Sequence, residues 1–217
     1  FLLDVAHDSG SPVNVFSVLG QYPDGQGPGA YRVTYDPRTN SIVDTSPYPS
    51  SSRQCASPSG IATCVTDIQL QQEIDRNIQA HDPRGRGPHD VWLVFLPPDV
   101  DTCVSVGSCA TNAYAGYHSL LNVGHGAVIY SVIPDPLIES TPPPGSDPQG
   151  NPEAESAINT VAHEAVEASS NPAGAGWMDP NGFEVGDKCE SGPQTGTPLG
   201  YSANGSPYNQ VIAGHDY

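Results

Sequence analysis

The chain has 217 residues, enough for one domain with a sizeable core, and its 24 acidic against 7 basic residues give a formal net charge of −17. Such an acidic surface repels nucleic acid and anionic membranes, and the chain has no apolar run of roughly 18 residues that would span a bilayer. Its 23 glycines and 23 prolines indicate a core with long loops rather than a disordered chain.

The first third of the chain predicts short strands and loops. Residues 13–19 and 31–35 alternate apolar and polar side chains, as half-buried strands do. A turn at 36–40 leads into a third short strand at 41–43, and the Ser/Pro-rich stretch 45–62 predicts a loop.

The middle of the chain predicts one helix and two strands. The helix covers residues 68–80 and is capped by the Thr-Asp pair at 66–67. The continuous apolar runs 91–96 and 127–133 predict strands buried on both faces, each ended by prolines. Residues 103–124 between them predict a polar excursion closed by cysteines.

A second helix is predicted over residues 151–170. Asn151 is a good N-cap, Pro152 suits the first helical position, and the Asn-Pro pair at 171–172 ends the helix. Residues 173–217 show little periodicity and predict loops with one short strand.

Together these elements predict an α/β (α+β) fold. We expect a mixed twisted sheet packed on two main helices, metalloprotease-like, with long Pro/Gly-rich loops. Residues 1–217 are expected to form a single domain.

The five cysteines indicate an oxidising compartment. Cys55 with Cys64 and Cys103 with Cys109 suit short disulfide-closed loops, while Cys189 is left over as a free thiol or a metal ligand. The alternative is a set of reduced cytosolic thiols. A start at Phe1 without methionine or signal-peptide pattern is typical of a processed chain, and the acidic composition with its single lysine also favours secretion.

The most informative motif lies in the second predicted helix, His163-Glu164-Ala165-Val166-Glu167. Residues 163 and 167 are four apart, so their side chains lie on one helix face and can reach one metal ion. Glu164 points about 100° away around the helix, where it can act as a general base on water at the ion. The motif is the zinc-protease pattern H-E-x-x-H with the second histidine replaced by glutamate, which zinc also accepts.

A catalytic zinc site needs a third protein ligand, and Asp187 is the best candidate. It follows Glu167 by twenty residues, after a glycine-rich turn, and this spacing resembles that of thermolysin-like zinc proteases. Two anionic oxygens make the site less positive than a histidine-rich one, so Mn²⁺ or Ca²⁺ is an alternative to Zn²⁺.

Weaker candidates lie outside this helix. His118 and His125 are candidates for stabilising a substrate oxyanion or for an alternative ligand, although such histidines are more often hydrogen-bonded loop residues. Residues 179–184 resemble an oxygen-rich cation loop, but an Asx-type turn is favoured. The charges of the 163–167 motif also have an ordinary interpretation as a solvated helix face.

Several segments occur in a characteristic order along the chain: residues 91–98, the Cys103 and Cys109 pair, 116–119, 162–168, 171–172, 176–177 and 184–189. This order resembles the plant exordium / phosphate-induced protein family and its microbial secreted relatives over about residues 64–190. The resemblance implies secretion and a metalloprotease-like helix, with His163, Glu164, Glu167 and Asp187 on the family's motif, while the plant members are known chiefly as cell-wall growth proteins.

These observations predict a secreted zinc-dependent endopeptidase acting on a protein or peptide substrate. His163, Glu167 and Asp187 would hold the metal and Glu164 would act as base. The alternative is a non-catalytic extracellular or cell-wall binding protein that keeps a structural metal.

Overall fold

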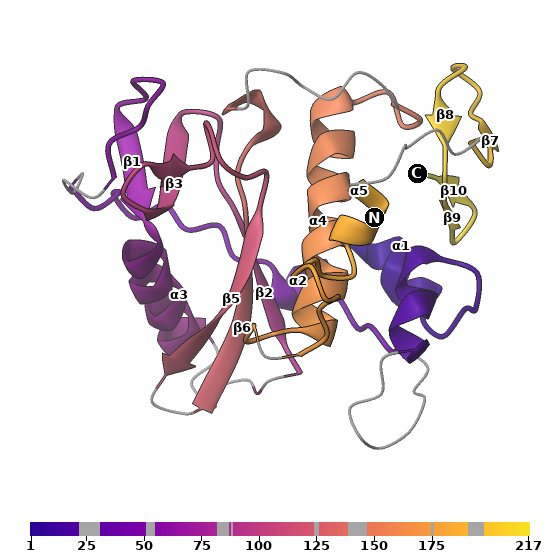
Figure 1. Ribbon diagram of the computed structural model, residues 1–217, viewed down its shortest axis with the longest axis horizontal. Helices are drawn as coiled ribbons and strands as arrows, with labels where there is room; N and C mark the ends of the chain where they lie inside the picture. The colour runs from indigo at the N-terminus through magenta and orange to yellow at the C-terminus, as the bar shows by residue number, and fades with distance from the viewer. Residues whose placement is uncertain are drawn as a thin grey trace.

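The computed structural model describes residues 1–21, 31–50, 55–81, 87, 89–123, 126–138, 147–174, 176–190 and 198–217 (Figure 1). The fold is α+β, with two main helices and mixed sheets, as predicted. The helices are α1 (Leu2–His7), η1 (Val15–Gln21), α2 (Pro37–Asn40), α3 (Asp67–His81), η2 (Pro136–Ile138), α4 (Pro152–Ser170) and α5 (Asp187–Glu190). The strands are β1 (Thr63–Thr66), β2 (Val91–Phe95), β3 (Val100–Ser105), β4 (Ser108–Cys109), β5 (Tyr117–Val123), β6 (Gly126–Ile133), β7 (Gly200–Tyr201), β8 (Pro207–Tyr208), β9 (Val211–Ile212) and β10 (His215–Asp216).

Two three-stranded mixed sheets form the centre of the molecule. In the larger sheet β6 lies between β2, which is parallel to it, and β5, which is antiparallel. In the smaller sheet β3 lies between the parallel β1 and the antiparallel β4. The expected mixed sheet is therefore divided into two.

The larger sheet separates the two main helices (Figure 1). Val128, Tyr130 and Val132 of β6 belong to one apolar cluster with Leu70, Ile74 and Ile78 of α3. Because side chains alternate along a strand, the intervening residues of β6 face the opposite side, where α4 packs on β6, β5 and β2. The α3 face is apolar, and the α4 face carries the polar site described below.

Both helices begin as the sequence predicts. Thr66 and Gln69 bond reciprocally at the start of α3, since Thr66 N donates to Gln69 Oε1 at 2.9 Å and Gln69 N to Thr66 Oγ1 at 3.3 Å. Asn151 caps α4 by accepting from Ala154 N at 3.2 Å, with Pro152 in the first turn. The helix ends at Ser170, before Asn171.

Asp67, the first residue of α3, links this helix to the larger sheet. Its Oδ1 accepts hydrogen bonds from Tyr117 of β5 at 2.8 Å and from Tyr130 of β6 at 2.6 Å. The apolar face of α3 is thereby held at a fixed position along the sheet.

The strands predicted near the N-terminus are wrong. Residues 15–19 of the predicted strand 13–19 belong to the 3₁₀ helix η1, because Phe16 and Leu19, three residues apart, both pack into a second apolar cluster. Residues 31–35 and 41–43 form no strand. Val33 N, for example, donates to Ser9 Oγ at 2.8 Å instead of to a neighbouring strand.

Other predictions need correction in detail. The polar excursion predicted over 103–124 contains a full strand, β5, together with part of β3 and all of β4. β2 is only half-buried and Phe95 is 55% exposed, so this strand is not covered on both faces, whereas the second half of β6 is. Residues 198–217 hold two short hairpins, β7–β8 and β9–β10, rather than one strand.

Two disulfides confirm the expected cysteine couples. Cys55 is bonded to Cys64 and Cys103 to Cys109, and all four side chains are buried in one cluster beside the smaller sheet. The side chain of Cys189 lies outside the described residues. Among the helices of the described residues, none is both long and apolar enough to cross a lipid bilayer.

Candidate metal centre

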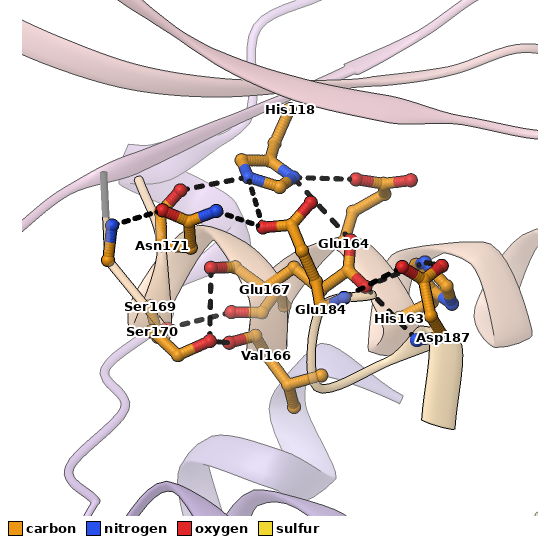
Figure 2. A network of polar contacts seen from close by, with 12 residues as sticks. His118, His163, Glu164, Val166, Glu167, Ser169, Ser170, Asn171, Glu184 and Asp187 are labelled. Carbon is orange, nitrogen blue, oxygen red and sulfur yellow. Dashed lines mark hydrogen bonds and ion pairs between the residues drawn. The ribbon is translucent and has the colours of Figure 1, made fainter. Parts of the chain in front are cut away.

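Helix α4 presents His163, Glu164 and Glu167 toward a polar cluster between the helix, strand β5 and the segment that precedes α5 (Figure 2). Glu164 and Glu167 are each only 4% exposed. Burial of ionised carboxylates costs free energy unless they are paired or bind a cation, so this pair requires compensation from its surroundings.

His118 of β5 provides part of that compensation. Its register partner in the larger sheet is the buried Ser131 of β6, on the face that α4 covers. His118 Nδ1 lies 3.1 Å from Glu164 Oε2 and 3.8 Å from Glu167 Oε2. Its Nε2 lies 3.2 Å from the carbonyl oxygen of Asn171, the residue that ends α4.

The segment 184–187 adds two more carboxylates. Glu184 Oε1 accepts from Asn171 Nδ2 at 2.6 Å, and Asp187 Oδ2 accepts from Glu184 N at 2.8 Å. Asp187 N in turn donates to Glu167 Oε1 at 3.1 Å. Val185 packs beside Val166 of α4 in the second apolar cluster, which fixes this segment against the helix.

Gly186 allows the segment to approach the helix closely. A Cβ at this position would lie 2.8 Å from Glu167 Oε1 and 3.0 Å from His163 Cγ. Real Cβ atoms essentially never approach within 3.0 Å of another atom, so a side chain here would displace one of the two proposed ligands.

The ligands expected from the sequence, His163, Glu167 and Asp187, come together. His163 Nε2 lies 3.2 Å from Glu167 Oε1 and 3.8 Å from Asp187 Oδ1. Ligand atoms around a tetrahedral zinc with bonds of 2.0–2.2 Å are separated by about 3.4 Å. One nitrogen and two carboxylate oxygens at these separations fit zinc, and small adjustments would centre the ion.

A second set shares Glu167 with the first. A ligand atom from each of His118, Glu164 and Glu167 lies within 4.8 Å of the others, as in the set of His163, Glu167 and Asp187. The two oxygens of Glu167 point in different directions, Oε1 toward His163 and Oε2 toward His118. The cluster therefore contains two overlapping candidate cation sites.

The environment shifts the pKa of three groups. Burial disfavours a charged His118, but its hydrogen bond and charge interaction with Glu164, and the charge of Glu184, outweigh burial and raise its pKa. Burial also opposes ionisation of Glu167, yet the hydrogen bond from His163 lowers its pKa. Burial raises the pKa of Glu184. Glu167 is thus held in the ionised form that a ligand needs.

A cavity of about 440 Å³ opens beside the cluster. It provides a route from solvent to the imidazole of His118. Its lining residues are His118, Ser119, Leu120, Asn171, Pro172, Ala173, Gly174 and Glu184.

Five of the residues singled out from the sequence gather in this cluster. His118 and Glu164 form one set with Glu167, and His163 and Asp187 form another with the same Glu167, whereas His125 lies outside the described residues. The 179–184 loop is the expected Asx turn, in which the Oδ1 of its first residue accepts from the backbone N of residues 181 and 183 at 2.9 and 3.0 Å.

Two residues of the cluster, Asn171 and Glu184, are not expected from the sequence. The sequence identifies Asn171 only as the residue that ends a helix, and Glu184 as part of a turn. The sequence signal for Glu184 is the resemblance of residues 184–189 to a segment of the exordium family. Comparisons with family models, with curated proteins and with solved structures gave no match.

Proposed function

We propose that the protein is a secreted zinc-dependent endopeptidase. The observation that carries the proposal is the convergence of His163 Nε2, Glu167 Oε1 and Asp187 Oδ1 beside the buried carboxylate of Glu164. The imidazole nitrogen favours zinc over Ca²⁺, which prefers an all-oxygen site, so zinc is the first choice and Mn²⁺ the alternative.

Zinc bound there would polarise the scissile carbonyl and lower the pKa of the attacking water. Glu164 would take the proton of that water. It follows His163 directly in α4 and lies in the same cluster, because both ligand sets share Glu167. His118 holds Glu164 through its Nδ1 at 3.1 Å and is held itself by the Asn171 carbonyl. We therefore assign His118 the positioning of the base rather than direct contact with an oxyanion.

Secretion is supported by two disulfides and by the resemblance to the exordium family and its secreted relatives. The cavity of about 440 Å³ has a volume within the usual range of ligand pockets, and it reaches the cluster at His118 and Glu184 rather than at the three proposed zinc ligands. A protein or peptide substrate is accordingly the proposed partner.

A second candidate function rests on the burial of Glu164. At 4% exposure this carboxylate is almost completely removed from solvent. A non-catalytic extracellular or cell-wall binding protein with a structural metal would show the same feature, because its site needs no access for substrate.

Replacement of Glu164 separates the two candidates. The Glu164→Gln variant is expected to keep zinc at the His163 site and to lose at least 100-fold of its peptide-cleaving activity, as loss of a general base costs about 10²–10⁴-fold. Glu153→Gln, an exposed glutamate of the same helix, is the matched control and should retain activity. Zinc-loaded wild-type protein that cleaves no peptide in a mixed peptide library would instead support the binding protein.

A further inference from the structure

The carboxylate of Glu167 has an imidazole on each side. Its Oε1 lies 3.2 Å from His163 Nε2, and its Oε2 lies 3.8 Å from His118 Nδ1. The two histidines come from different elements, α4 and β5, so the carboxylate lies between two separate donor sets. A carboxylate in this position can bridge two cations through its two oxygens.

We propose that a second divalent cation binds between His118, Glu164 and Glu167, bridged to the first by Glu167, and that this ion inhibits the enzyme. The inference rests on the proposed function for its effect on activity, but not for the binding of the ion. A transition-metal ion such as zinc fits best, because the donors are again one imidazole nitrogen and two carboxylate oxygens.

The hydrogen bonds of His118 point to a cation beside its Nδ1. Its Nε2 can bond to the Asn171 carbonyl at 3.2 Å only as a donor, so in the neutral ring Nδ1 carries a lone pair. That lone pair would face carboxylate oxygens of Glu164 and Glu167. In the metal-free protein a proton on Nδ1, donated to Glu164, separates these acceptors, and a metal ion can take the place of that proton.

The same arrangement is typical of a histidine ligand. Histidines that bind metals commonly donate their other ring N–H to a backbone carbonyl, which fixes the tautomer and the ring orientation. The separations of 3.1 and 3.8 Å from Nδ1 to the two oxygens bracket the value of about 3.4 Å expected around a tetrahedral ion.

The negative charge of the cluster is also large enough for two divalent cations. Four carboxylates, those of Glu164, Glu167, Glu184 and Asp187, surround only two imidazoles. One Zn²⁺ would neutralise half of the four negative charges. The second ion would bind more weakly than the first because Glu167 shares its charge between them.

Inhibition follows from the identity of the second ligand set. Glu164 is the proposed base, and a cation on its Oε2 occupies the lone pair that would accept a proton from water. We therefore expect activity to rise with the first equivalent of zinc and to fall as the second site fills.

The test is zinc stoichiometry, measured on metal-stripped protein by titration calorimetry and elemental analysis. Wild-type protein should bind two equivalents, and zinc-edge X-ray absorption should show zinc–zinc scattering at about 3.5–4 Å. His118→Gln should bind one equivalent without that scattering, and His81→Gln, an exposed histidine, should bind two. If His118→Gln does not fold, as judged by circular dichroism, Glu164→Gln gives the same measurement and should bind one.

The outcomes separate this inference from the proposed function. A single zinc in wild-type protein, lost in His163→Gln and kept in His118→Gln, overturns the second site and leaves the endopeptidase intact. Two zinc ions in a protein that cleaves no peptide at any zinc concentration support the second site and contradict the endopeptidase. If wild-type protein binds two zinc ions and His118→Gln still binds both, the second ion lies elsewhere and the inference is overturned.

Discussion

Helices α3 and α4 cover opposite faces of one sheet with opposite chemistry. α3 buries Leu70, Ile74 and Ile78, which repeat every four residues along one apolar stripe. α4 also buries valines and an alanine, but two of its most buried side chains are Glu164 and Glu167.

Under the proposed function, α3 serves the stability of the fold and α4 carries the metal site. An apolar stripe against a sheet stabilises the fold with no further requirement. Buried carboxylates lower stability unless a hydrogen bond, an ion pair or a bound cation compensates them, and α4 has this requirement whereas the apolar stripe of α3 does not. Four experiments test this contrast.

The largest effect is expected for Glu167→Gln. This residue belongs to both candidate metal sites, so its loss should weaken zinc binding at least 1000-fold, or about 4 kcal/mol, as measured by competition with a chelator. The metal-free variant should also lose the stability that ionised Glu167 contributes through its contacts with His163 and Asp187 N, so it should be less stable than the wild type near neutral pH. Unchanged zinc affinity would show that the cluster is not a metal centre.

Ile74→Ala should produce the opposite result on the other helix. The side chain is 4% exposed within the α3 cluster, and its truncation should lower the free energy of unfolding by about 3 kcal/mol. Denaturant titration of metal-free protein measures this loss. Zinc stoichiometry should stay at the wild-type value, and a change in it would mean that the two faces are coupled.

Gly186→Ala tests the close approach of the 184–187 segment. The new Cβ would displace Glu167 or His163, and we expect zinc affinity to fall about tenfold, which corresponds to about 1.4 kcal/mol. Gly87→Ala is the matched control, because a Cβ there meets no atom within 4 Å. Equal affinities in the two variants would contradict the geometry described for Gly186.

The smallest effect is a pH dependence of the metal-free protein. The pKa of His118 is raised above 6.5, so its contribution to stability is complete below that pH and is lost as the pH rises through the folded value. The pKa of Glu167 is lowered below 4.5, so its contribution is present above that pH and is lost as the pH falls through the folded value.

Unfolding of metal-stripped protein measured from pH 2 to 9 checks both limbs. His118→Gln should remove the decline on the alkaline side. Ile74→Ala should lower the whole curve without changing its shape, since it adds no titrating group. If stability still declines on the alkaline side in His118→Gln, the decline belongs to another residue.

Local signals predict the two helices and β6 well, because caps, prolines and apolar runs act within a few residues. Local signals fail where contacts between residues far apart in the sequence determine the conformation. Residues 15–21 take a 3₁₀ conformation because the apolar cluster of α1, α4 and β9 receives Phe16. Strand β5 is not predicted because it contains polar residues such as His118, and the sequence alone does not show that they lie on a covered face of the sheet.

The same limit applies to the candidate site. The i, i+4 spacing of His163 and Glu167 predicts their convergence, because a helix determines it locally. The contact of His118 with Glu164 depends on the register of β5 against β6, and the place of Glu184 depends on a hydrogen bond to Asn171. Neither leaves a periodic pattern in the sequence.

Tyr117 and His118 are consecutive, yet they serve opposite faces of the sheet. The phenol is anchored by Asp67 at the start of α3, and the imidazole points toward α4. Within the described part of the chain β5 is an edge strand that pairs with β6 alone, so a shift of that anchor would reach the imidazole through a single peptide unit. A substitution at Asp67 could therefore change the distance between His118 and Glu164 from a remote position. It would introduce no new group among the carboxylates of the cluster.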